Sequence, residues 1–222
     1  MIDALIDKTD TYEQIRDLIA SILAAESVSQ QALAVTAGED PSLWKLRVFI
    51  ERSNPWEQFV DTDPVDKSPI IGVWFDNDSI DLSASNLAQR QKYEGVFNID
   101  CYGYGEAADN PAGGHIPGDR LAALESQRAA RLVRNILMSG PYFKLGASTV
   151  VIDRYIQSRT TFQPPIGSDA AFKVIATRLD FRVSFNEFSP QNTPETLEYL
   201  AATITQIDTG EVLAEVDFDY TT

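Results

Sequence analysis

The stretch at residues 93–138 limits the possible folds more than any other part of the chain. It begins with YEGVFNIDCYGYG, in which apolar and polar residues alternate, and this alternation predicts a strand with one buried face. A loop rich in glycine and proline follows at 106–118, and at 119–138 apolar residues recur at helical spacing. A two-faced strand followed by an amphipathic helix predicts a sheet covered by that helix.

The helix predicted at 119–138 has a cationic side. At about 100° per residue, most of its aliphatic residues fall on one side and its arginines fall on the other. An exposed arginine can pair with an acid of a neighbouring subunit or remain in solvent, and the sequence leaves both possibilities open. The arginines concerned are Arg120, Arg128, Arg131 and Arg134.

A second main helix is predicted near the N-terminus. Asp10 or Thr11 can cap it, Glu13 or Gln14 can complete a capping box, and apolar residues keep helical spacing to about Glu26. Because the chain lacks repeated strand–helix–strand units, we predict an α+β fold with a mostly antiparallel sheet and two main helices on one face. The other strands are expected at 44–51, 70–75, 149–158 and 171–188, and a polar loop at 76–88.

The last part of the chain, 187–222, is predicted to be an acidic extension of a domain at 1–186. Pro194 can start a short helix at 195–201, and two strand-like runs around the Asp-Thr-Gly tripeptide at 208–210 predict a β-hairpin arm. In the second run, apolar residues alternate with acids. The acids that we expect to contact a neighbouring copy or an axial partner are Glu211, Glu215, Asp217 and Asp219.

Charge is distributed unevenly along the chain, whose formal net charge is −15. Residues 1–81 hold sixteen acids and six bases, residues 82–186 hold nine acids and twelve bases, and residues 187–222 hold eight acids and no base. A mildly basic centre between acidic ends can orient identical subunits head to tail. The alternative is an acidic protein whose ends are simply solvated.

Residues that usually perform catalysis are sparse. His115 is the sole histidine and Cys101 the sole cysteine, so we expect neither a zinc site nor a nucleophile–base pair. The Asp-Thr-Gly tripeptide occurs once, whereas aspartic proteases need two carboxylates that share a proton. We therefore expect no enzyme activity, no cofactor and no metal. A small acidic hydrolase and a monomeric ligand-binding module are the alternatives.

The same composition bears on partners and location. The net negative charge predicts repulsion from nucleic acid and from anionic lipid, so that DNA can pass the protein without specific binding. The N-terminus lacks the basic segment and apolar core of a secretory signal, and we expect no apolar run of membrane-span length. Folding in the cytoplasm, without a membrane partner, is predicted.

The order of elements resembles that of the tail terminator proteins of long-tailed bacteriophages. The resemblance spans residues 11–186 and rests on the early helix, on SPIIGVWFDND with Pro69 before a central strand, and on YEGVFNIDCYGYG leading into the helix that carries Arg128, Arg131 and Arg134. It implies a small α+β subunit that forms a ring, usually hexameric, which caps the finished tail tube and joins it to the head. It carries over no catalytic residue.

This resemblance sets the expected partners. They are further copies of the chain, the tail tube protein or sheath protein, and the head–tail connector or neck proteins, all within a virion assembled in the host cytoplasm. Another neck or baseplate assembly role is the nearest alternative. Besides the arginine side and the terminal acids, the loop at 106–118 with His115 is expected at or near subunit contacts.

Overall fold

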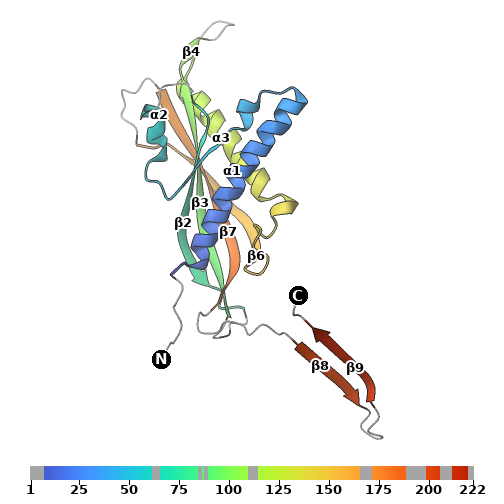
Figure 1. Ribbon diagram of the computed structural model, residues 1–222. Helices are drawn as coiled ribbons and strands as arrows, with labels where there is room; N and C mark the ends of the chain where they lie inside the picture. Colours follow the sequence, from blue (N-terminus) through green and yellow to red (C-terminus); the bar gives the residue numbers. More distant parts are fainter. Residues whose placement is uncertain are drawn as a thin grey trace.

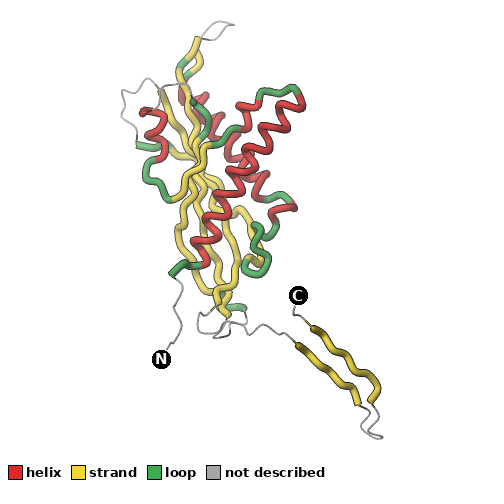
Figure 2. Tube along the Cα trace, in the orientation of Figure 1, coloured by secondary structure: helices red, strands yellow, loops and turns green. Residues whose placement is uncertain are grey.

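A five-stranded sheet with two long helices on one face forms the main body of the protein (Figure 1). The computed structural model describes residues 8–61, 66–84, 87, 90–109, 115–165, 172–188, 199–205 and 212–219. Figure 2 shows both helices, in red, crossing the same side of the yellow strands. In sheet order the strands are β1 (Arg47–Ile50), β2 (Ile70–Ile80), β3 (Arg90–Glu106), β7 (Phe172–Phe188) and β6 (Val151–Phe162).

The sheet is antiparallel except at one edge, where β1 runs parallel to β2. The predicted α+β class and mostly antiparallel sheet are therefore confirmed. The predicted end of β2 at Phe75 is wrong, because the strand continues to Ile80 beyond a bulge between Phe75 and Asn77. Backbone pairing with β3 sustains this polar stretch, and its mostly exposed side chains need no apolar pattern.

Helix α1 (Thr11–Ala37) begins as the sequence predicts and ends later. Asp10 is its N-cap, and the capping box with Glu13 is present. The predicted end near Glu26 is wrong. Residues 27–37 contain no glycine or proline, and the helix ends only at Gly38, which adopts a left-handed conformation with φ 75°.

Helix α3 (Gly118–Leu137) matches its prediction closely and lies directly on the sheet. Gly103 and Gly105 of β3 make this close approach possible. A Cβ added at Gly103 would come closer than 3.0 Å to backbone atoms of Ala122 and Ser126, and one at Gly105 would meet the backbone of α3 in the same way. The hydroxyls of Ser126 on α3 and Thr177 on β7 are 3.0 Å apart, within hydrogen-bond distance, and both residues are buried.

The main core lies between the two helices and the sheet. Burying an aliphatic or aromatic side chain of this size stabilises a fold by roughly 1.5–3 kcal/mol, so this layer holds the helices in place. A smaller cluster on the opposite face of the sheet is built around Phe59, Ile70 and Tyr102, beside the short helices η2 (Pro55–Glu57) and α2 (Gln58–Asp61). The main core includes Ile15, Ile19, Leu23, Phe97, Ile99, Val133, Leu137, Phe181 and Phe185.

Short elements fill the connections. The predicted strand at 44–51 is wrong at its start, because Pro41–Trp44 forms the 3-10 helix η1, capped by Asp40. The loop at 106–118 includes two short paired strands, β4 (Ala108–Asp109) and β5 (His115–Ile116). A further 3-10 helix, η3 (Gly140–Tyr142), follows α3.

The C-terminal extension contains the predicted hairpin as a separate two-stranded sheet. Strand β8 (Tyr199–Thr205) pairs antiparallel with β9 (Val212–Asp219). The turn at 208–210 lies outside the described residues. The predicted helix at 195–201 is wrong at its end, because Tyr199 is the first residue of strand β8 and pairs with Asp219. The start of that predicted helix, 195–198, lies outside the described residues. In β8, the backbone N–H and C=O groups form hydrogen bonds with β9, whereas in a helix they would bond within the same segment.

Candidate subunit-contact surfaces

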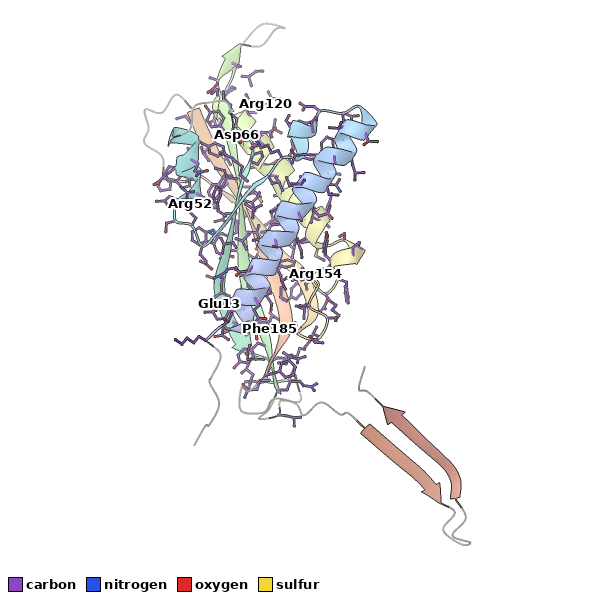
Figure 3. All side chains as sticks on the ribbon, viewed as in Figure 1. Glu13, Arg52, Asp66, Arg120, Arg154 and Phe185 are labelled. Atoms are coloured by element: carbon purple, nitrogen blue, oxygen red, sulfur yellow. The ribbon has the colours of Figure 1, made fainter. Side chains whose placement is uncertain are left out.

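The first candidate surface is the arginine face of α3, defined by Arg120, Arg128, Arg131 and Arg134. The structure leaves all four exposed, as their helical spacing predicts, and Figure 3 labels Arg120 near the start of the helix. Arg128 pairs with Glu125, one turn earlier, at 2.8 Å. Within the described part of the chain, the other three have no ion pair or hydrogen bond. Their role in subunit contacts stays a prediction.

A groove runs along one side of this face. It has a volume of about 380 Å³ and lies between α3 and the segment that joins α1 to the sheet. Leu46 and Ala129 are buried, whereas Leu43, Arg128 and Arg131 are exposed. The groove therefore has an apolar interior and a cationic edge. It is lined by Leu43, Trp44, Leu46, Pro69, Glu125, Arg128, Ala129, Arg131, Leu132 and Asn135.

A buried serine fixes the wall of the groove opposite α3. The Ser27 hydroxyl donates a hydrogen bond to the Trp44 carbonyl at 2.9 Å and accepts one from the Leu46 backbone N–H at 2.9 Å. Gln31 adds a bond to the Ser27 carbonyl from the next turn of α1. These bonds tie η1 and the start of β1 to α1, so the wall is set by the main fold.

The second candidate surface is the C-terminal half of α1. Residues 21–37 include a single charged residue, Glu26, which accepts a hydrogen bond from the Tyr142 hydroxyl at 2.6 Å. Val28, Leu33 and Val35 are nevertheless 68%, 58% and 64% exposed. Val28 and Val35 are seven residues apart and share one side of the helix, whereas Leu33 lies about 140° around the helix from Val28. The uncharged side that exposes the two valines is a candidate surface for contact with another protein.

The apolar character of α1 also corrects an expectation about membranes. Among the described residues, α1 is long and apolar enough to cross a membrane by length and composition, and 28% of its most apolar window is buried. Core helices of soluble proteins pass the same test. The expectation that no apolar run reaches this length is therefore wrong. The full burial of Ile15, Ile19 and Leu23 against the sheet indicates a core helix whose second half projects beyond the core.

Arg154 of β6, labelled in Figure 3, secures the end of α3. Its guanidinium donates to the carbonyls of Leu137 at 2.6 Å, Ser139 at 2.7 Å and Phe143 at 2.8 Å, and the residue is only 5% exposed. Burial lowers the pKa of Arg154, against the opposing charge of Asp153. A cation at the carbonyl end of a helix satisfies its orphan acceptors. Sequence patterns missed this residue because its partners lie on other elements.

On the opposite sheet face, a bidentate ion pair joins Asp100 to Arg178, which face each other in the β3–β7 register. The two nitrogen–oxygen distances are 2.7 Å and 2.8 Å, and the Tyr102 hydroxyl lies 3.3 Å from the same carboxylate. Hydrogen bonding to Asp100 raises the pKa of Arg178, and burial raises that of Tyr102. With its oxygens already bonded, Asp100 has a structural role.

Two further titratable side chains, Cys101 and Asp66, are buried or held in an ion pair. Among the residues that the structure describes, no group of three or more His, Cys, Asp or Glu could hold a metal ion. Cys101 is fully buried, and burial raises the pKa of its thiol. Burial would raise the pKa of Asp66, but hydrogen bonds from Lys45 and Ser68 lower it to about 2. This carboxylate is held ionised in an ion pair with Lys45 at 2.8 Å.

Most of the remaining predicted contact residues lie on the short strand β5 or on the hairpin strand β9. His115 begins β5, where its backbone faces Asp109 of β4, and its side chain lies outside the described residues. Glu211 also lies outside them. Glu215, Asp217 and Asp219 belong to β9, for which the structure describes the backbone path alone.

Comparisons with protein families and with curated proteins identify no relative of this chain. No protein-family model matches the chain, and no curated protein sequence matches it. The function is therefore inferred from the surfaces themselves and from the order of elements.

Proposed function

We propose that this chain is a structural subunit of a bacteriophage tail, which assembles into a ring at the head-proximal end of the tail tube. The observation that carries the proposal is a pair of uncovered surfaces on neighbouring helices. The apolar second half of α1 and the arginine face of α3 lie on the same side of the sheet, with the groove between α3 and the segment that follows α1. Exposed surfaces of this kind suit a protein that works by contacting others.

A ring agrees with the chemistry of these surfaces. A row of arginines repels a second copy of itself, so the arginine face favours a head-to-tail contact with an acidic surface over a two-fold contact. Head-to-tail contacts close into a ring when the rotation between subunits allows it. The acidic segment at 187–222, with eight acids and no base, supplies charge opposite to the arginines. We propose a hexamer, in line with the resemblance to tail terminators.

The position in the tail follows from the same resemblance. The proposal is supported by the order of a capped helix, three strands, α3 and two long paired strands over residues 11–186, which is the order on which the resemblance to that family rests. In this role, the ring stops tube growth and contacts the tail tube or sheath protein on one side and the connector or neck proteins on the other. The net charge of −15 would let DNA pass without binding.

Two measurements test the proposal. Light scattering and electron microscopy of the purified protein should show a closed ring, whereas a monomer at high concentration in both low and moderate salt would argue for a ligand-binding module or a hydrolase. In the phage that encodes the chain, a nonsense mutation should give heads without tails and tubes of uncontrolled length. Tubes of normal length that join heads would overturn the terminator role, and labelling at the baseplate would favour the alternative assembly role.

A further inference from the structure

The groove beside α3 is a permanent part of the fold. Ser27 holds its Trp44–Leu46 wall on α1, and the close seat of α3 on Gly103 and Gly105 holds the other wall. Its volume of about 380 Å³ lies within the range of roughly 300–1,000 Å³ usual for binding sites. A preformed groove of this size can receive side chains without rearrangement of the core.

Its chemistry specifies the kind of partner. The interior is formed by leucine, tryptophan and alanine side chains, and the exposed Arg128 and Arg131 stand at its edge. Arg128 has a single, solvent-exposed partner in Glu125, and Arg131 has no ion pair within the described chain. A complementary ligand is an extended segment with apolar residues on one side and acids on the other.

The chain itself contains a segment of this chemistry. The sequence EVLAEVDFD at 211–219 alternates apolar residues with acids over most of its length, and its residues 212–219 form β9. Alternate residues of a strand point to opposite sides. A segment of this sequence can therefore direct apolar side chains into the groove while its carboxylates face the mouth, where the two arginines lie.

The ring proposed above favours a neighbouring copy over the same copy. In a head-to-tail ring, each subunit presents one surface to one neighbour and a different surface to the next. A groove that receives the extension of one neighbour, and an extension that enters the groove of the next, use each surface once per subunit. An extension bound in the groove of its own copy would link no subunits.

We propose that the groove beside α3 binds the acidic segment at 211–219 of a neighbouring copy of this chain. The inference rests on the ring assembly proposed above. It makes the C-terminal extension the link between adjacent subunits.

Disulfide trapping in the full-length protein tests the contact. Asn135→Cys places a thiol at the groove, and Asp217→Cys places one on the acidic segment; the native Cys101 is buried. When the two variants are co-expressed with different tags and oxidised, we expect a covalent dimer that carries both tags. Gln127→Cys is the matched control, because it is exposed on α3 without lining the groove. Dimers of equal yield with the control would overturn the assignment.

A second variant separates the contact between copies from a contact within one copy. With Asn135→Cys and Asp217→Cys in the same chain, an oxidised monomer without dimer would show that each segment occupies its own groove and would overturn the inference. Light scattering on the same samples distinguishes the two proposals. Rings without the mixed dimer contradict the groove assignment alone, whereas monomers contradict the ring itself.

Charge reversal provides an independent readout. We expect Arg128→Glu with Arg131→Glu to weaken self-association about tenfold, which corresponds to about 1.4 kcal/mol. Adding Glu215→Arg and Asp217→Arg should restore it, because the two reversals recreate opposite charges. Loss without restoration would contradict the pairing of these particular groups.

Discussion

The two long helices of this protein cover the same face of the sheet but present different outer sides to solvent. α3 exposes four arginines, which water solvates at little cost. The second half of α1 exposes Val28, Leu33 and Val35 with almost no charge, and each exposed Å² of such surface costs about 25 cal/mol relative to burial. The comparison teaches that α1 gains more free energy from a partner, whereas α3 gains orientation and specificity.

The largest effect on stability is expected from a substitution that disturbs the packing of α3 on the sheet. Gly103→Ala should lower the free energy of unfolding by about 3 kcal/mol, because the new methyl group meets the backbone of α3 and the helix must move away. Gly140→Ala is the matched control, since a Cβ there meets no atom within 4 Å. Chemical denaturation measures both. Equal stability of the two variants would show that α3 does not need to pack this closely on Gly103.

A slightly smaller effect is expected at the end of α3. Arg154→Met keeps an apolar stem but removes the donors to three carbonyls, so we expect a loss of about 2–3 kcal/mol in unfolding free energy. Arg159→Met on the same strand, where the side chain is exposed, should change stability by less than about 0.5 kcal/mol. Thermal and chemical unfolding of the pair would check this. A neutral Arg154→Met would mean that water replaces the guanidinium without cost.

Substitutions on α1 test whether its exposed valines form a contact between subunits. Val28→Lys with Val35→Lys should weaken self-association tenfold or more, about 1.4 kcal/mol, while unfolding changes little because both side chains are exposed. The control is Ser29→Lys with Thr36→Lys, which adds the same charge to exposed polar positions of the helix. Light scattering over a concentration series compares the two. If both pairs weaken assembly equally, charge is responsible and the apolar side is not a contact.

The boundaries of α3 could be predicted from sequence, whereas the extent of α1 could not. The apolar residues of α3 face the core over its whole length, so helical spacing marks both ends. Beyond Ser27, α1 projects past the core, so burial imposes a weaker pattern there, and helix propensity and the Gly38 cap decide its end. The polar end of β2 was missed for a similar reason, since pairing with β3 rather than burial maintains it.

The candidate site was predictable only in part. The arginine face follows from spacing within one helix, and the structure leaves it exposed as expected. The groove requires η1, the start of β1 and α3 to meet, and the role of Arg154 depends on carbonyls 11–17 residues away. Such contacts depend on strand order and register, which local patterns do not specify.

The smallest expected effect concerns pH and the wall of the groove. The Asp66 pKa is lowered from 3.8 to about 2 by bonds from Lys45 and Ser68, despite burial. The unfolded chain therefore binds this proton more readily, so the stabilisation is present above pH 3.8 and is lost as pH falls towards 2. Because both partners are partly exposed, we expect about 1 kcal/mol.

Asp66→Asn should lose this amount at pH 6, and its difference from the native protein should shrink as pH falls from 3.8 through about 2. Burial raises the pKa of Asp78 and Glu187, which gives these groups the opposite pH dependence, but both are present in each variant and cancel in the comparison. Glu39→Gln is the control, since Glu39 is exposed and its side chain has no ion pair in the described residues. Denaturation at several pH values measures the difference. A difference that stays constant from pH 6 to pH 2 would show that the Asp66 carboxylate charge does not stabilise the strand connection beside the groove.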